Sequence, residues 1–266
     1  MGFTCGLVGL PNAGKSTLFT ALTGAVTLIA PYPFSTLDPR KGVVPVPDER
    51  LDRLAAALRP AKVTPTHLEV MDIAGLVEGA SRGEGLGNQF LSHIRAVEAL
   101  AHIVRCFRSA EIPHVGGEPD PPRDVGIVNT ELLLADLEVV ERRLEKVTRA
   151  ARAEPKATRG ELALLERCRE ALARATPLRN LETAVVQAAL IRELGLLTSK
   201  PTCYVANVDR ADPGSLALAE QLEAVAGGAP VVTVDGKLEG DLAQLPPEEA
   251  RQFRTELGLG ESALVR

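Results

Sequence analysis

Residues 9–16 have the sequence GLPNAGKS, which fits the phosphate-binding-loop pattern G-x-x-x-x-G-K-S/T. Such a loop lies between a buried strand and a helix, because the helix N-terminus must direct successive N–H groups at phosphate oxygens. The apolar residues 3–10 precede the loop, and a helical pattern over residues 15–23 follows it. The stretch therefore predicts an α/β domain that binds a nucleoside triphosphate.

Each residue type in this loop has a chemical reason to be there. Gly9 and Gly14 permit the tight backbone path, Lys15 would contact the β- and γ-phosphates, and the Ser16 hydroxyl would ligate Mg²⁺. A glycine-rich turn before an ordinary helix is the alternative, and the strand-loop-helix context disfavours it. We expect the following residues to bind the nucleotide: Asn12, Ala13, Gly14, Lys15, Ser16 and Thr17.

A second motif, D-x-x-G, ends the apolar run 68–73 with Asp72 and Gly75. An acid at a strand end can hold Mg²⁺ through water, and the Gly75 N–H can meet a γ-phosphate. A lone motif of this kind is weak, because Asp often precedes a turn, but its place at a strand end strengthens it. Thr36, in a proline-rich stretch, would close over the metal, although threonine there is more often structural. The predicted metal ligands are Ser16, Thr36 and Asp72.

Short apolar runs alternate with helical patterns along the chain, which predicts βαβ units and a mostly parallel sheet flanked by helices. A further strand at residues 42–46 belongs at the sheet edge, because Pro45 has no N–H to donate to a ladder. The other predicted strands are residues 3–10, 68–73, 102–107, 201–208 and 230–234.

Residues 129–197 break that rhythm with a seam of apolar residues spaced four and three apart, which is typical of a coiled coil. A turn at 153–160 separates the seam from a second apolar stripe, so we predict an inserted α-helical coiled-coil hairpin. Residues 1–128 and 198–266 would then form one discontinuous nucleotide-binding domain. The seam is Leu133, Leu137, Val140, Leu144 and Val147, and the facing stripe is Leu162, Leu165, Cys168 and Leu172.

Composition excludes several classes of protein. The net charge of −5 gives no overall attraction to nucleic acid or anionic membrane, and 3% aromatic residues argue against a base-stacking platform. The four scattered cysteines include no C-x-x-C pair, so neither a disulfide framework nor a zinc site is predicted. No secretory or membrane-spanning stretch is present, and we expect a cytoplasmic monomer that does not contact membrane.

Four stretches of the chain resemble the YchF (Obg-like ATPase) family, a branch of the translation-factor-related P-loop GTPases. They are MGFTCGLVGLPNAGKSTLFTALTGA, PFSTLDPRKGVVPVPDERL, DIAGLVEGASRGEGLGNQFL and NTELLLADLEVVERRLEK. The resemblance implies a GTPase-like domain interrupted by a helical coiled-coil domain, ATP preferred over GTP, Mg²⁺ dependence and contact with ribosomes. A ubiquitin-like TGS domain normally follows in the family, so this chain resembles a fragment or a shortened form.

The base is predicted from the segment after the strand at 201–208. A guanine site has N-K-x-D there, and its Asp accepts two hydrogen bonds from guanine. Here Asn207 is in place, but Val208 replaces Lys and Arg210, which cannot accept a hydrogen bond, replaces Asp. Guanine would keep unpaired donors at a cost of roughly 1–3 kcal/mol for each buried group.

Both base-contacting segments depart from the family pattern, which has N-x-x-E at the first and a small Ser-Ala-type pair at the second. The second segment has Asp235, Gly236 and Lys237 instead. We expect Asn207, Val208, Asp235 and Gly236 to line the base site, with ATP preferred and a GTPase of the same fold as the alternative.

Hydrolysis needs a group outside the loop. Leu76 follows D-x-x-G, where GTPases have a Gln that orients water, and Leu cannot do so. Either the site does not hydrolyse, or another group positions the water. The resemblance points to His114, in a Pro- and Gly-rich loop, as catalytic together with Lys15; simple solvent exposure is the alternative for a loop histidine. In relatives that use K⁺, an Asn at this loop position helps to ligate the ion, so Asn12 would mark a K⁺ site here, although Asn is also a common turn residue.

We therefore expect a slow ATPase whose hydrolysis resets a switch that acts with the ribosome. An ATP-gated adaptor for which hydrolysis hardly matters is the alternative from another class. A basic run in the hairpin would meet rRNA phosphates, but interleaved glutamates make a solvated, self-paired helix face at least as good an interpretation. The basic residues are Arg142, Arg143, Lys146, Arg149 and Arg152, and the acids are Glu138, Glu141 and Glu145.

Overall fold

The computed structural model describes residues 2–24, 39–73, 75, 86–182, 185–260, 262 and 264. The chain divides into two compact units. Unit 1 comprises Met1–Gly75, Val97–Asp124 and Thr202–Arg266, and unit 2 comprises Leu76–Ala96 and Val125–Pro201. None of the helices in the described part of the chain has the length and apolar character needed to cross a membrane.

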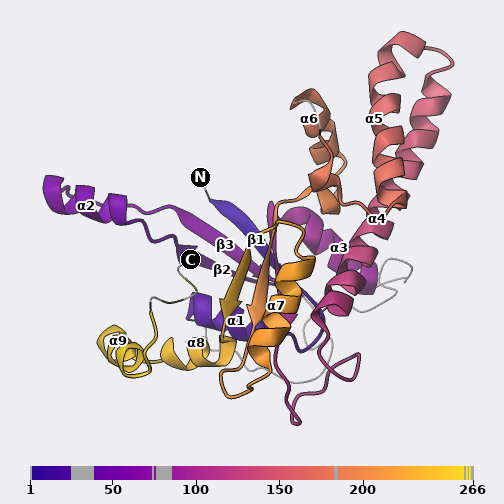
Figure 1. Cartoon of the computed structure of the whole chain (residues 1–266). Coiled ribbons are helices and arrows are strands. Elements are labelled where there is room, and N and C mark those ends of the chain that lie inside the picture. Colours follow the sequence, from indigo (N-terminus) through magenta and orange to yellow (C-terminus); the bar gives the residue numbers. More distant parts are fainter. Residues whose placement is uncertain are drawn as a thin grey trace. The chain divides into compact units, whose positions relative to one another are not determined.

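Within the described residues, unit 1 contains six strands in one sheet, in the order β2-β3-β1-β4-β5-β6. Figure 1 labels β1, β2 and β3 of this sheet. Neighbouring strands are parallel except β2, which is antiparallel to β3. The predicted mostly parallel sheet is confirmed, and β2, which ends at Pro45, is the predicted edge strand. The strands are β1 Phe3–Val8, β2 Arg40–Pro45, β3 His67–Asp72, β4 Ala99–Arg105, β5 Thr202–Asn207 and β6 Val231–Val234.

Burial along the strands follows their place in the sheet. All seven residues of β4 are buried, as expected for a central strand covered on both faces. In β2 the exposed and half-buried residues alternate, as expected of an edge strand with one face toward solvent. The carboxyl ends of β1, β3 and β5 carry the predicted site motifs, so the parallel order gathers these motifs at one edge of the sheet.

Helix α1, Lys15–Thr23, has the bounds predicted from the sequence. Its apolar side, Leu18 and Phe19, packs in one cluster with residues of β1, β3, β4 and β6, and α1 also contacts α8. Gly24 ends the helix in the left-handed conformation, which costs little without a Cβ. The other helices of unit 1 are α2 Glu49–Leu58, α7 Ser215–Val225, α8 Gly236–Leu242 and α9 Pro247–Glu256.

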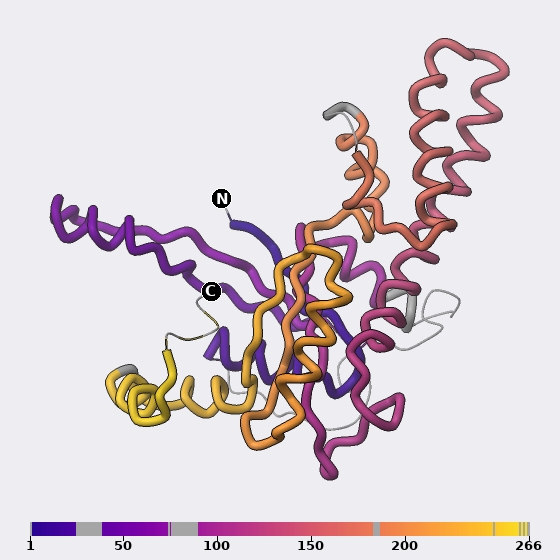
Figure 2. Tube along the Cα trace, in the orientation of Figure 1, coloured from indigo at the N-terminus to yellow at the C-terminus, as the bar shows by residue number. Residues whose placement is uncertain are grey.

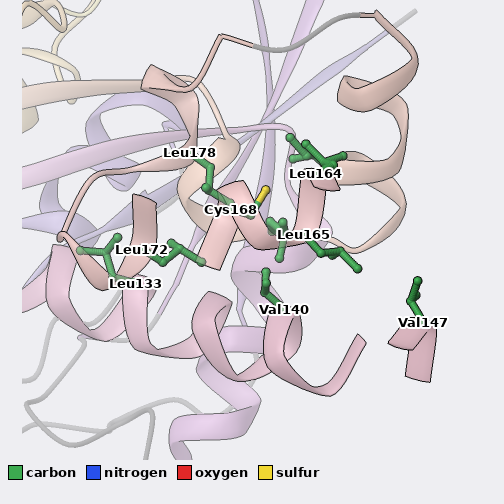
Figure 3. Packing of buried hydrophobic residues seen from close by; sticks show 10 residues of the cluster. Leu133, Val140, Val147, Leu164, Leu165, Cys168, Leu172 and Leu178 are labelled. Atoms are coloured by element: carbon green, nitrogen blue, oxygen red, sulfur yellow. The ribbon is translucent and has the colours of Figure 1, made fainter. Parts of the chain in front are cut away.

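Two long helices dominate unit 2. Helix α4, Pro121–Ala150, begins in unit 1 and continues into unit 2, where α5, Pro155–Ala173, runs back beside it (Figure 2). All residues of the predicted seam and facing stripe lie in one apolar cluster, part of which Figure 3 shows. Each fully buried leucine contributes about 1.5–3 kcal/mol. Unit 2 also contains α3 Leu86–Ala96, α6 Val185–Glu193 and the short 3-10 helices η1 Leu178–Asn180 and η2 Leu197–Ser199.

The predicted turn at 153–160 is too long. Only residues 151–154 connect the two helices, and Gly160 lies inside α5. The cause is Pro155, which suggests a break but fits the first turn of a helix, where its missing N–H would have had no partner. Helix α4 likewise begins at Pro121, earlier than the seam indicated.

Asp136 ties the end of unit 2 back to α4. Its carboxylate is fully buried and accepts hydrogen bonds from Leu197 N, Thr198 N and the Thr198 hydroxyl, each at 2.7 Å. The Thr198 hydroxyl oxygen in turn accepts from Leu178 N at 3.2 Å, so the same hydrogen-bond network connects η1 and η2. Burial raises the pKa of Asp136, and the donated hydrogen bonds oppose that shift. A buried acid is tolerated here because its partners satisfy it.

We expect Asp136→Asn to destabilise unit 2 by about 2–3 kcal/mol. The amide offers one oxygen, whereas Leu197 N and the two donors of Thr198 approach both carboxylate oxygens. The measurement is the opening free energy of the residue 197 and 198 amides from hydrogen exchange. The control is Glu138→Gln, which removes an exposed ion pair with Arg142 on the same helix. It should change the opening free energy by less than about 0.5 kcal/mol. Equal exchange in both variants would mean that the network is dispensable.

Candidate nucleotide-binding site

The phosphate loop is built so closely that two of its positions accept only glycine. Gly9 has φ 147°, and a Cβ there would lie 2.3 Å from the carbonyl oxygen of Ile103. Gly14 has φ 98°, and a Cβ there would lie 2.1 Å from Nδ2 of Asn207. Both backbones are in a region that favours glycine, and both are in contact with the neighbouring strands β4 and β5. The loop shape is therefore fixed by its surroundings as well as by its own sequence.

Lys15 is buried beneath this loop. Its ammonium group donates to the carbonyl oxygens of Leu10 at 2.8 Å and Gly9 at 3.1 Å, and the residue is only 6% exposed. Burial lowers the pKa of Lys15 to about 8, while the negative charge of Asp72 acts in the opposite direction. The group is thus a cation already inside the site, with two neutral acceptors that a phosphate can replace.

The predicted metal ligands Ser16 and Asp72 meet. The Ser16 hydroxyl donates to Oδ2 of Asp72 at 2.7 Å, which brings the start of α1 and the end of β3 together. A hydroxyl and a carboxylate are hard oxygen donors of the kind Mg²⁺ prefers, so this pair fits the metal. The described residues contain no group of three or more His, Cys, Asp or Glu suited to a metal, and Mg²⁺ held partly by phosphate oxygens needs none.

Gly75 lies against the phosphate loop, as the D-x-x-G prediction requires. A Cβ at Gly75 would come within 3.0 Å of the backbone of Pro11, so glycine allows the close approach. Thr36, the third predicted metal ligand, and Leu76 lie outside the described residues. The structure therefore brings together Lys15, Ser16, Asp72 and Gly75.

Asn207 connects the phosphate loop to the opposite side of the site. Its side-chain amide donates to the carbonyl of Ala13 at 2.9 Å and accepts from the N–H of Gly236 at 3.0 Å. Asn207 is 5% exposed, so both bonds are shielded from water. The predicted residues Ala13, Asn207 and Gly236 thus lie together, with both the nitrogen and the oxygen of the Asn207 amide bonded to backbone groups.

The two base-side segments are also joined. Asp235 caps α8 by accepting from Leu238 N at 3.0 Å, and its other oxygen accepts from Arg210 N at 3.2 Å. The carboxylate of Asp209 accepts from Ala211 N at 2.8 Å and so closes its own turn. Val208 is buried and donates its N–H to Val234. These bonds order the backbone of both segments and leave the exposed Arg210 in the position of the guanine-reading acid.

Thr17 follows Ser16, a predicted metal ligand, on α1 and is half-buried. Its methyl group lies 3.8 Å from the place a Cβ on Gly240 would take, so this face of α1 is turned toward α8. Thr17 therefore lies next to the loop, although its side chain approaches a neighbouring helix.

The side chain of His114 is buried although the residue as a whole is half-buried, so solvent exposure does not describe the imidazole. The side chain is 2% exposed, and Nε2 lies 2.9 Å from Oδ2 of Asp124, whose side chain is 5% exposed. The other ring nitrogen, Nδ1, accepts from the N–H of Gly116 at 3.0 Å. Both nitrogens therefore have partners outside the phosphate loop.

The residue before His114 nevertheless contacts the phosphate loop. The Asn12 amide donates to the carbonyl of Pro113 at 3.0 Å, and the buried Arg105 guanidinium donates to the same oxygen at 3.4 Å. Asn12 adopts a positive φ of 61°, which Asn tolerates better than most residues. The loop that carries His114 is thus held to the phosphate loop one residue away from the histidine.

Sequence reasoning missed Arg105, Arg123 and Asp124. Asp124 lies in the first turn of α4, where an acid is favoured by the helix dipole and attracts no notice. Arg123 donates to Asp124 and also to the carbonyls of Gly116 and Glu118. Of the three, Arg105 alone could have been noticed, because a charged residue inside the apolar run 102–107 needs buried partners.

Comparisons with known proteins give consistent relatives. A family model described as a 50S ribosome-binding GTPase matches residues 4–135. The chain is 48% identical over 268 residues to the ribosome-binding ATPase YchF of Escherichia coli O157:H7, covering all of this chain and 74% of that protein. The protein of that name from Bacillus subtilis is 48% identical over 269 residues, with 99% and 74% covered. The solved Schizosaccharomyces pombe YchF GTPase is similar with a TM-score of 0.80 and 38% identity, covering 99% of this chain and 73% of that one.

We expect triphosphate affinity to fall about tenfold between pH 7 and pH 9. With a pKa of about 8, Lys15 loses its charge in this range, and bound phosphate charge favours the protonated form. The complex thus holds more protons than the free site, so binding weakens as pH rises. Calorimetry in two buffers of different ionisation enthalpy measures this proton uptake. Lys15→Arg should remove the pH dependence and the exposed Lys41→Gln should keep it; equal affinity at both pH values in the unaltered protein contradicts the assignment.

Proposed function

This chain belongs to the YchF family, and on that premise we propose that it is a molecular switch that hydrolyses ATP and works with the ribosome. The observation that carries the proposal is the meeting of the Ser16 hydroxyl and Asp72 at 2.7 Å, beside the buried ammonium of Lys15. These groups are the phosphate and metal half of a P-loop nucleotide hydrolase. When bound, Mg²⁺ would neutralise developing phosphate charge, with Ser16 and Asp72 holding it.

ATP preference is supported by the base-side segments. The acid that pairs with guanine is replaced by Arg210, and the two nearby acids are engaged: Asp209 with Ala211 N and Asp235 with Leu238 N and Arg210 N. Guanine would therefore lack an acceptor for its N1–H and amine, whereas adenine has no N1–H to satisfy. A GTPase of the same fold is the alternative.

For hydrolysis we propose that His114 positions the attacking water, in place of the Gln that ordinary GTPases have after D-x-x-G. The support is the bond between Asn12 and Pro113, which anchors the His114 loop to the phosphate loop. The proposed role needs the ring to give up a present partner, because both ring nitrogens are engaged. An ATP-gated adaptor that does not depend on hydrolysis is the alternative.

The partner is proposed as the ribosome, which is the partner that the names of the bacterial relatives give. We propose that residues 129–197 act as an inserted helical domain that helps to engage it, in a monomeric cytoplasmic protein. The proposal of direct RNA contact with the basic run of α4 has less support, because three arginines of this run pair with glutamates. These pairs are Arg142–Glu138, Arg149–Glu145 and Arg143–Glu161.

Calorimetry of the full chain with ATP and with GTP tests the base, and ribosome co-sedimentation with each nucleotide tests the partner. We expect ATP to bind at least about tenfold more tightly than GTP, because guanine leaves one or two donors unpaired. Co-sedimentation should depend on which nucleotide is present. Tighter binding of GTP than of ATP would favour the GTPase alternative. Co-sedimentation that is the same with both nucleotides and without them would contradict the proposed switch.

His114→Ala should lower kcat for ATP at least about tenfold and leave the ATP dissociation constant within about twofold, since it removes a water-positioning group and no phosphate contact. Turnover and calorimetric titration are measured on the same preparation, with His67→Ala as the control, because His67 is exposed at the start of β3. Unchanged turnover would remove His114 from the mechanism.

The same turnover assay, run in KCl and in NaCl, tests the proposed K⁺ site. With Asn12 Nδ2 committed to Pro113, the oxygen of the same amide is the atom that would ligate K⁺. Equal turnover in the two salts would remove K⁺ from the proposal.

A further inference from the structure

The hydrogen bonds around His114 define which ring nitrogen carries the proton. The N–H of Gly116 donates to Nδ1 at 3.0 Å, so Nδ1 is the unprotonated acceptor. The ring proton is therefore on Nε2, which donates to Oδ2 of Asp124 at 2.9 Å. With the His114 side chain 2% and the Asp124 side chain 5% exposed, water competes little for the bond between them. The pair thus fixes the tautomer as well as the place of the ring.

Asp124 is itself held from the other side. Its Oδ1 accepts from Nη2 of Arg123 at 3.1 Å and from Nε at 3.3 Å. Arg123 also donates to the carbonyls of Gly116 and Glu118, so one guanidinium holds both the carboxylate and the loop. A Cβ on Gly116 would lie 2.6 Å from this guanidinium, so a side chain there would require Arg123 to move. The arrangement is a built clamp in which each carboxylate oxygen has one assigned partner.

The two bonds of the ring differ in strength. Nε2 is held by a buried carboxylate, whereas Nδ1 has only a backbone N–H from two residues along the same loop. If the loop turn at Gly116 opens, Nδ1 becomes a free acceptor while the bond to Asp124 persists. Because Pro113 is bonded to Asn12, this opening takes place in a loop already anchored to the phosphate loop.

We propose that Asp124 is a positioning residue for the hydrolytic reaction. By keeping the proton on Nε2, it leaves Nδ1 of His114 as the nitrogen that accepts a hydrogen bond from the attacking water. This inference rests on the proposed role of His114. It assigns to Asp124 the function that an orienting carboxylate has beside other catalytic histidines, and it names Nδ1 as the acting atom.

Asp124→Asn separates this role from a structural one. Arg123 and His114 both donate to the side chain, one to each oxygen, and an amide offers only one oxygen. If the amide oxygen faces Arg123, its NH₂ faces Nε2 and drives the ring proton to Nδ1. The water-accepting nitrogen is then lost although the side chain keeps its size.

The experiment compares the unaltered chain with Asp124→Asn, Asp124→Glu and His114→Ala by ATP turnover, ATP affinity and ¹⁵N NMR of the histidine rings. The chain has four histidines, so the His114 signals can be assigned by difference. We expect a pyridine-type Nδ1 in the unaltered protein and a changed tautomer in Asp124→Asn. In that variant kcat should fall about tenfold or more, with affinity within about twofold, and Asp124→Glu should recover part of the loss.

Asp120→Asn is the matched control, because Asp120 accepts from Arg123 N at the same helix start and has no bond to the ring. It should leave kcat within about twofold; an equal loss there would assign the effect to the helix start and overturn the proposal. Asp124→Asn with full turnover, while His114→Ala is slow, overturns this inference and leaves the proposed function standing. A rise in turnover means that Asp124 restrains His114, which also overturns it. Full turnover in His114→Ala overturns the proposed catalytic role itself.

Discussion

The candidate site depends on the two hydrogen bonds made by the side-chain amide of Asn207. Placed at the end of β5, the amide bonds the phosphate loop at Ala13 on one side and the start of α8 at Gly236 on the other. Two glycines follow from it, since a Cβ on Gly14 or Gly236 would lie 2.1 or 2.8 Å from this amide. The phosphate loop and the start of α8, where the base was expected to bind, are therefore joined through one side chain, and a residue expected to touch the nucleotide has a structural role.

Most of the fold could be predicted because its signals are local. Buried parallel strands are short apolar runs, and only an edge strand tolerates Pro45. The strands of the sheet could therefore be predicted from the apolar runs and from the position of this proline. The seam of unit 2 follows from its heptad spacing. The helix starts were harder, because Pro121 and Pro155 suggest breaks in a sequence and yet fit a first helical turn.

The candidate site divides in the same way. That Lys15, Ser16 and Asp72 lie near one another could be predicted, since each belongs to a contiguous motif whose place at a strand end or helix start is defined by spacing. The bond between His114 and Asp124 could not be predicted, because it depends on how a Pro- and Gly-rich loop folds back on the start of α4. Asp124 has no motif, and an acid in a first helical turn is ordinary. Such pairs become visible only when burial and distance are known.

The hydrogen bonds of Lys15 to the carbonyls of Gly9 and Leu10 also determine which ligands can enter the site. An incoming group must exchange with two acceptors that the loop itself supplies. A polyphosphate carries enough negative charge to win this exchange, whereas a nucleoside without phosphates offers nothing to compensate for it. The phosphate loop therefore selects its ligands by charge, and an uncharged nucleoside would be rejected there whatever its base.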